Sequence, residues 1–166
     1  MKKSHFIIPL AILLCFSFSC QKQNKETAPP VNIEAEEAKI KEVLHQYAMA
    51  WKDEDMDMFS KTFSHDDDLV VFDGNIAARF VDWEAWRDRL QEHLESYENV
   101  DISSRDLLIK VHASGDVAWL SCLLDADFLY QGQKGEMKGL RATWILENRQ
   151  GSWIIVQAHF SLVDDR

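Results

Sequence analysis

Hydrophobic and polar residues alternate along the C-terminal third of the chain, and short polar turns interrupt the alternation. The turns are Ser114–Asp116, Gln131–Gly135 and Asn148–Gly151, whose glycines and small polar residues tolerate tight bends. This pattern predicts consecutive hairpins of four strands, near residues 100–112, 117–130, 136–147 and 152–162. Antiparallel strands of this length twist strongly, so we expect a curved sheet with a concave face and a convex one.

The preceding part of the chain shows helical periodicity. Apolar residues recur every three or four positions over residues 33–52, at Ile40, Val43, Leu44, Tyr47 and Trp51. Asp55 is expected to cap a second, short helix, and Asp82 a third helix that carries Trp83, Trp86, Leu90, Leu94 and Tyr97 on one side. Short strands are expected between these two helices, at 69–72 and 77–81. Helices grouped before antiparallel strands predict an α+β fold in which three helices cover the sheet and enclose a cavity.

The first 32 residues differ from the rest. Residues 1–20 combine two lysines, an apolar run too short to span a bilayer and small residues before Cys20, which is typical of an export signal. The segment resembles a bacterial lipoprotein signal, which implies lipidation at Cys20 and a membrane anchor; the alternative is ordinary secretion with cleavage nearby. Residues 21–32 are polar and contain two prolines, which predicts a disordered tether. One folded domain is therefore expected over 33–166.

Charge and motifs narrow the classes of partner. The formal net charge of −10 makes the chain a poor candidate for nucleic-acid binding. Ser64–Asp68 places a histidine beside three aspartates, but it lacks the glycine and distal glutamate of a calcium loop, so we expect a solvated turn and no metal. No phosphate loop, nucleotide fingerprint, zinc pair or nucleophile motif is found, and no cofactor is expected. Cys122 is expected to be a buried core thiol.

The order of the elements, with short sequence pieces at matching spacing, resembles the nuclear transport factor two-like (cystatin-like) fold and, within it, the SnoaL-like group. The pieces are Tyr47–Trp51 followed by Asp57 and Phe59, then Val71–Asp73, Gly115–Trp119, Gly139–Thr143, and Gly151–Ile155 running on to His159–Ser161. The likeness covers about residues 35–162. It implies a cone-shaped curved sheet closed by helices. It says less about activity, because this fold hosts isomerases, cyclases, dehydratases and proteins without known chemistry.

The polarity of the last strand predicts which side chains line the cavity. Trp153, Ile155, Gln157, His159 and Ser161 share one face, with polar residues toward its end, as a pocket requires. If paired residue numbers of the last two strands sum to about 300, Arg141 and Thr143 lie opposite His159 and Gln157. Asp125 and Asp127 share this face with Trp119. One of them is expected to pair with Arg141, because a buried aspartate needs a partner.

Three functions follow as alternatives. The first is binding of a small, partly apolar molecule by Arg141, Thr143 and Gln157 together with Tyr47, Trp51, Trp83, Trp86 and Trp119. The second is an acid/base enzyme for a small carbonyl compound, with His159, Asp125 or Asp127 as the catalytic group; SnoaL-like cyclases use a histidine or aspartate in this cavity. The third is a dimerisation module with a vestigial pocket, in which these residues form a structural ion pair and a satisfied histidine.

A homodimer is expected through the other face of the sheet. That face is predicted to be convex and broadly apolar, which usually marks an interface, and family members commonly pair through it. Its predicted members are Leu120, Cys122, Leu124, Ala126, Phe128, Leu140, Trp144, Leu146, Val156 and Phe160. A shift of one residue would exchange the two faces, so the pocket and dimer assignments depend on each other.

Overall fold

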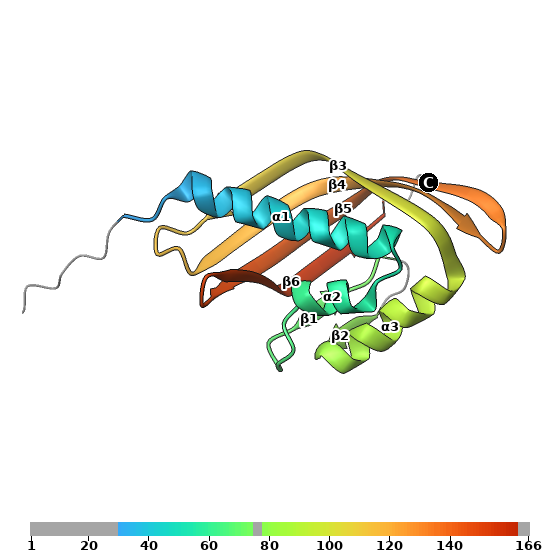
Figure 1. The fold of residues 1–166 in the computed structure, drawn as a ribbon, viewed down its shortest axis with the longest axis horizontal. Coiled ribbons are helices and arrows are strands. Elements are labelled where there is room, and N and C mark those ends of the chain that lie inside the picture. Colours follow the sequence, from blue (N-terminus) through green and yellow to red (C-terminus); the bar gives the residue numbers. More distant parts are fainter. Residues whose placement is uncertain (1–29, 75–77, 163–166) are drawn as a thin grey trace, which may run out of the picture.

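A computed structural model describes residues 30–74 and 78–162, which form one layer of helices against one sheet (Figure 1). The predicted α+β class is confirmed. The predicted export signal with Cys20, and residues 21–29 of the predicted tether, lie outside the described residues. Among the described helices, none is long and apolar enough to cross a membrane. The elements are α1 (Ile33–Lys52), α2 (Met56–Thr62), β1 (Val70–Phe72), β2 (Arg79–Val81), α3 (Trp83–Ser96), β3 (Tyr97–Val111), β4 (Val117–Tyr130), β5 (Gln133–Arg149) and β6 (Ser152–Ser161).

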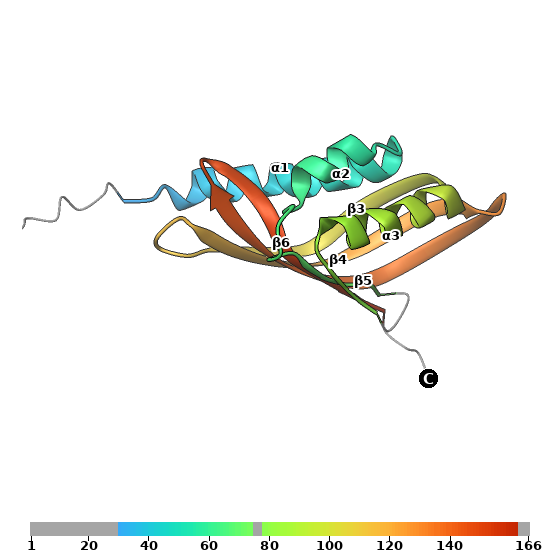
Figure 2. The same ribbon diagram turned by 90° about the horizontal axis from the view of Figure 1, so that it is seen from below.

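The sheet has six strands in the order β2-β1-β6-β5-β4-β3 and is curved but not closed (Figure 2). Strands β3 to β6 form the predicted antiparallel hairpins, whereas β1 runs parallel to β6. β5 begins three residues earlier than predicted. The reason is that Gln131 and Gly132 alone make the turn, both with positive φ (53° and 74°), which lets pairing resume at Gln133.

The helix starts follow the sequence signals. The side chain of Asp55 accepts a hydrogen bond from the Met58 amide at 3.0 Å, and that of Asp82 accepts one from the Ala85 amide at 2.9 Å. Asn32 caps α1 in the same way, through the Ala35 amide at 3.2 Å. The two predicted caps are thus confirmed, since each satisfies an amide that the first helical turn leaves unpaired.

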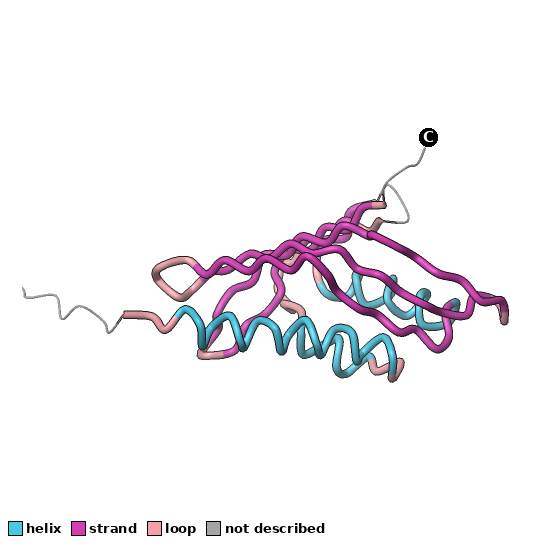
Figure 3. The backbone as a smooth tube through the Cα atoms, turned by 90° about the horizontal axis from the view of Figure 1, so that it is seen from above, coloured by secondary structure: helices cyan, strands magenta, loops and turns pink. Residues whose placement is uncertain are grey.

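All three helices lie on one side of the sheet, and the other side carries no helix (Figure 3). We call these sides the helix face and the outer face. Buried residues of the helix face include Ala118, Leu120 and Cys122 of β4, Ala142, Trp144 and Leu146 of β5, and Ala158 and Phe160 of β6. Most of the set predicted to be a convex, exposed dimer surface therefore forms the core instead. That prediction is wrong.

A β-bulge in β6 explains part of this exchange. Ile145 pairs with Gln157 and Leu146 with Ile155, so Val156 is an extra residue in the ladder. Trp153 and Ile155 point to the helix face, as predicted. Beyond the bulge, Ala158 and Phe160 point to the helix face, so Gln157 and His159 point to the outer face. A single inserted residue reverses the inward and outward positions of everything after it.

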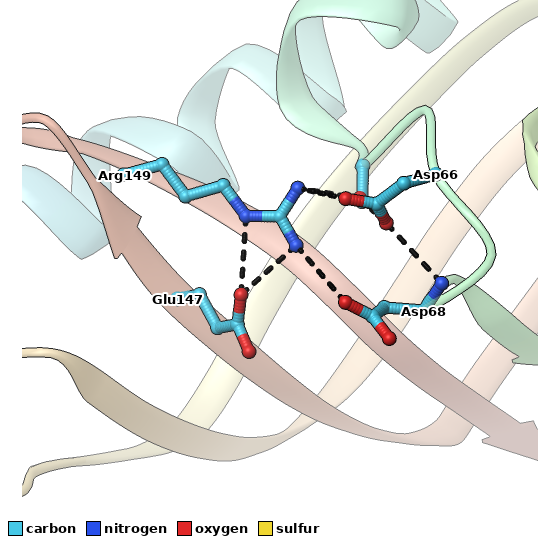
Figure 4. Close-up of polar contacts among 5 residues, drawn as sticks. Asp66, Asp68, Glu147 and Arg149 are labelled. Atoms are coloured by element: carbon cyan, nitrogen blue, oxygen red, sulfur yellow. Dashed lines mark hydrogen bonds and ion pairs between the residues drawn. The ribbon is translucent and has the colours of Figure 1, made fainter.

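The side chain of Arg149, at the end of β5, binds the turn between α2 and β1 (Figure 4). Its guanidinium group bonds Asp66 and the Ser64 hydroxyl in this turn and Glu147 in its own strand, and Asp68 lies 3.7 Å away. The predicted solvated turn at Ser64–Asp68 is therefore a turn whose aspartates face an arginine. This attachment fixes the segment that leads into β1 and to Asp73 at its end.

Candidate functional site

A cavity of about 420 Å³ lies between the C-terminal part of α1, helix α3 and strands β3 to β6. Its volume is in the range that holds a small organic ligand. The walls are largely aromatic and aliphatic. They include Tyr47, Trp51, Trp86, Leu124, Phe128 and Phe160.

Polar atoms meet at one side of this apolar space, where Asp73, directly after β1, faces helix α3. The Asp73 carboxylate is only 7% exposed, and its Oδ2 accepts a hydrogen bond from Arg89 Nε at 2.8 Å. The same oxygen lies 3.2 Å from His93 Nε2. Asp73 and His93 line the cavity, and Arg89 supports Asp73 from outside the lining. The arrangement is a buried carboxylate and imidazole held by a cation.

Charge and tautomer follow from these contacts. Partial burial lowers the pKa of Arg89, but hydrogen bonds to Asp73 and Glu92 outweigh it and hold the pKa above its usual value. Because an ionised carboxylate only accepts hydrogen bonds, Nε2 of His93 carries the proton shared with Asp73. In the neutral ring, Nδ1 then holds the lone pair, and no residue in the described part of the chain bonds it. His93 thus has a ring nitrogen that can accept a hydrogen bond.

Further hydrogen-bond donors lie in the cavity wall, on α1 and on α3. Tyr47 is 4% exposed, and its ring stacks on Phe160. Burial raises the pKa of Tyr47 well above its usual value, although the neighbouring Trp51 indole acts in the other direction. The phenol therefore stays protonated. The buried indole Nε1 atoms of Trp51 in α1 and Trp86 in α3 have no hydrogen-bond acceptor within bonding geometry among the described residues, so a ligand could accept from them.

The model of the SnoaL-like domain matches residues 40–165, three quarters of the chain. The chain belongs to the SnoaL-like domain family. No curated protein matches it significantly in sequence. This assignment confirms the resemblance inferred from the short sequence pieces.

Solved structures agree on the fold. A nuclear transport factor two-like protein of unknown function from Pseudomonas putida is 23% identical, with a TM-score of 0.64 over 80% of this chain and 89% of that one. A nuclear transport factor two-like superfamily protein from Salmonella enterica gives 13% identity and a TM-score of 0.71, over 80% and 95%. A protein described as a candidate dehydratase from Streptomyces avermitilis gives 13% identity and a TM-score of 0.71, over 79% and 98%.

Three of the predicted ligand-binding residues lie in the cavity wall of this SnoaL-like domain, namely Tyr47, Trp51 and Trp86. Trp83 does not. It is buried between Phe63, whose ring centroid is 6.2 Å away, and His65, which stacks on it at 4.7 Å. Trp83 is a core residue beside the cavity.

The other predicted site residues lie on the outer face, so the prediction that they line the cavity is wrong. They are Trp119, Asp125, Asp127, Arg141, Thr143, Gln157 and His159, and the cavity lining contains none of them. Thr143 pairs with His159, and Arg141 pairs with Ser161, two positions from the predicted register. The turn sets the first of these two positions, since Arg149 pairs with Ser152, and the bulge at Val156 adds the second. His159 is exposed and touches the ring of Phe72, with centroids 5.7 Å apart.

The predicted pairing of Arg141 with an aspartate is also wrong. Asp125 accepts hydrogen bonds from the Gly139 amide at 2.7 Å and from Arg105 Nε at 2.9 Å. These bonds, that of Gly139 first, hold the pKa of Asp125 below its usual value. Asp127 lies at the surface, 3.6 Å from Lys138 Nζ. The backbone turns at Gly139, where φ is +72°, and this bend brings its amide to the carboxylate.

Asp73 and His93 were not among the predicted site residues. Asp73 follows a buried strand and reads as the start of a turn. His93 offers a clearer signal, because it falls on the buried stripe of Trp86 and Leu90 in α3, where a histidine needs a polar partner. The sequence does not reveal which residue supplies that partner.

Proposed function

We propose that this SnoaL-like domain binds a small, partly apolar molecule in the cavity between its helices and its sheet. One observation carries the proposal: the wall of an otherwise apolar cavity contains Tyr47 and the hydrogen-bonded pair Asp73–His93. Apolar walls with a few placed polar groups are the usual composition of a ligand site. A ligand oxygen would accept a hydrogen bond from Tyr47, and a hydroxyl or enol would donate to His93 Nδ1.

The test compares two conservative changes. Tyr47→Phe removes one buried donor, so the affinity for a ligand recovered from the purified protein should fall about tenfold, the effect of roughly 1 to 1.5 kcal/mol. Thr143→Ala, an exposed change on the outer face, should leave the affinity unchanged. Isothermal titration calorimetry measures both. Equal affinities for Tyr47→Phe and the unmodified protein would contradict the proposed site.

A second candidate function is proton transfer on a small carbonyl compound. The buried Asp73–His93 contact favours it, because a carboxylate that orients an imidazole leaves the other ring nitrogen as a general base. Tyr47 would stabilise negative charge on the carbonyl oxygen. The fold match to a candidate dehydratase supports this candidate by analogy only.

Exchange of hydrogen for deuterium tests this candidate without knowledge of the natural substrate. A simple ketone that binds the cavity should exchange the protons next to its carbonyl faster in the presence of the protein, as followed by NMR in deuterium oxide. His93→Gln should slow this exchange at least about a hundredfold and leave ketone binding within a few fold. Exchange that is equally fast with His93→Gln would exclude His93 as the base.

We also propose that the protein is exported and lipid-anchored at Cys20. The support is the sequence pattern of residues 1–20. Cys20→Ser should abolish incorporation of an alkyne-labelled fatty acid and release the protein from the membrane fraction. A labelled Cys20→Ser variant would contradict this proposal.

A homodimer through the outer face is the last proposal, with members other than those predicted. This face carries no helix, yet it exposes Trp119 by 46% and Leu108 by 51%. Exposed large apolar side chains on an uncovered sheet favour a second copy as the partner. Trp119→Glu should convert a dimer into a monomer in analytical ultracentrifugation. Should the cavity bind nothing, this dimer would leave the third alternative, a dimerisation module.

A further inference from the structure

The cavity ends at a wall of three aromatic rings near the tip of the β4–β5 hairpin. The Tyr97 ring lies 5.1 Å from that of Phe128, edge to face, and 5.2 Å from that of Tyr130. Along β4, the lining residues are Leu124, Ala126 and Phe128, and Phe128 is the last of them before the turn. The Phe128 ring therefore lies at this end of the cavity.

The close contact with Gly135 fixes the position of the Phe128 ring. Gly135 pairs with Phe128 across the hairpin, and a Cβ atom at Gly135 would lie 2.3 Å from Cε2 of the ring. Gly135 is not among the glycines with positive φ, so its backbone does not require glycine. The missing side chain instead makes room for the ring, which lies against the strand backbone. Phe128 is thus held from below by Gly135 and from the side by Tyr97.

The opposite end of the cavity lies deeper under α1. There Phe160 stacks on Tyr47, and Phe160 pairs with Ala142, which pairs with Cys122. From Leu124 to Phe128, the lining part of β4 advances four residues, or roughly 13 Å. His93 stands along its side, with its ring 5.8 Å from those of both Trp51 and Tyr97.

We propose that Phe128 determines the length of the ligand. The ligand class that fits is an elongated, mostly apolar molecule with a carbonyl or hydroxyl group opposite His93, whose apolar end stops at the Phe128 ring. This inference rests on the proposed binding function of the cavity. It assigns Phe128 a role in specificity, seated by Gly135.

A series of straight-chain methyl ketones of increasing length tests the role of Phe128, by displacement of the fluorescent dye anilinonaphthalene sulfonate from the full-length protein. In the unmodified protein, affinity should rise about fourfold with each added carbon and then stop rising at one length. In Phe128→Ala, the rise should continue for two or three further carbons. The control is Leu129→Ala in the same strand, whose side chain points to the other face and which should keep the original limit.

An unchanged limit in Phe128→Ala would overturn the inference, as would a ketone series with no limit in the unmodified protein. Phe128→Leu provides a milder variant, should alanine prevent folding, and its limit should lie between those of the unmodified protein and alanine. Gly135→Ala should also move the limit, because its Cβ displaces the ring. Failure of the unmodified protein to bind any ketone or the dye would instead count against the proposed function, which separates the two failures.

Discussion

Filling the cavity should make the protein more stable while it removes binding. Ala126 is the residue to change, because it is 3% exposed and its side chain lines the cavity between Leu124 and Phe128. Ala126→Leu adds three carbon atoms to an apolar space that has room for them. An open ligand cavity lowers the stability of a protein but is needed for its function, so filling the cavity should raise the stability.

The magnitude follows from the carbon atoms added. Three buried carbons contribute up to about 2.4 kcal/mol at ~0.8 kcal/mol each. Ordering the leucine side chain costs about 0.5 to 1 kcal/mol. The free energy of unfolding should therefore rise by roughly 1.5 kcal/mol, and the melting temperature by about 5 °C for a domain of this size.

Urea unfolding followed by circular dichroism measures the change, and dye displacement measures the loss of binding. Ala142→Leu is the matched control. Ala142 is also a buried alanine of the helix face, but it lies outside the cavity lining, so leucine there should overpack the core and destabilise it by about 1 to 3 kcal/mol. Equal destabilisation by both leucines would show that Ala126 does not border an open space.

Further predictions concern the surface, the thiol and pH. Arg149→Met should lower the free energy of unfolding by about 1 kcal/mol, because the facing carboxylates lose their common cation; the 30% exposure of Arg149 limits the effect, and high salt should reduce it. No change in urea unfolding would contradict this. Burial raises the pKa of Cys122 to about 11, so iodoacetamide should alkylate it at pH ~8 only after unfolding. Rapid labelling of the native protein would oppose this. The pKa of Asp125 is lowered in the folded state, so its stabilising effect is present above the unfolded pKa of ~3.9 and is lost as pH falls through the folded value. Asp125→Asn should therefore flatten the acid side of the stability curve; an identical curve would contradict the assignment.

The sequence contains enough information for the class and the order of the elements. The glycine turns mark the hairpins, and Asp55 and Asp82 mark two helix starts, because these residues act through local geometry. The family could be inferred from the same local pieces.

The faces of the sheet could not be derived in the same way. β4 carries apolar residues on both sides, with Leu120 and Leu124 inside and Trp119 and Leu123 outside, so alternation alone does not decide which side meets the helices. The bulge at Val156 has no glycine that would indicate it in the sequence. Both features depend on packing against residues far away in sequence. The candidate site could not be predicted either, because Asp73 and His93 come together only in the folded chain.

A crystal structure of the protein purified without added ligand would show directly whether the cavity between the helices and the sheet binds a small molecule. We expect electron density for a bound molecule in the cavity, ordered against Tyr47 and His93 and ending at Phe128. A structure in which the rings of Tyr47, Trp51 and Trp86 fill this space, with no room for a ligand, would contradict the claim.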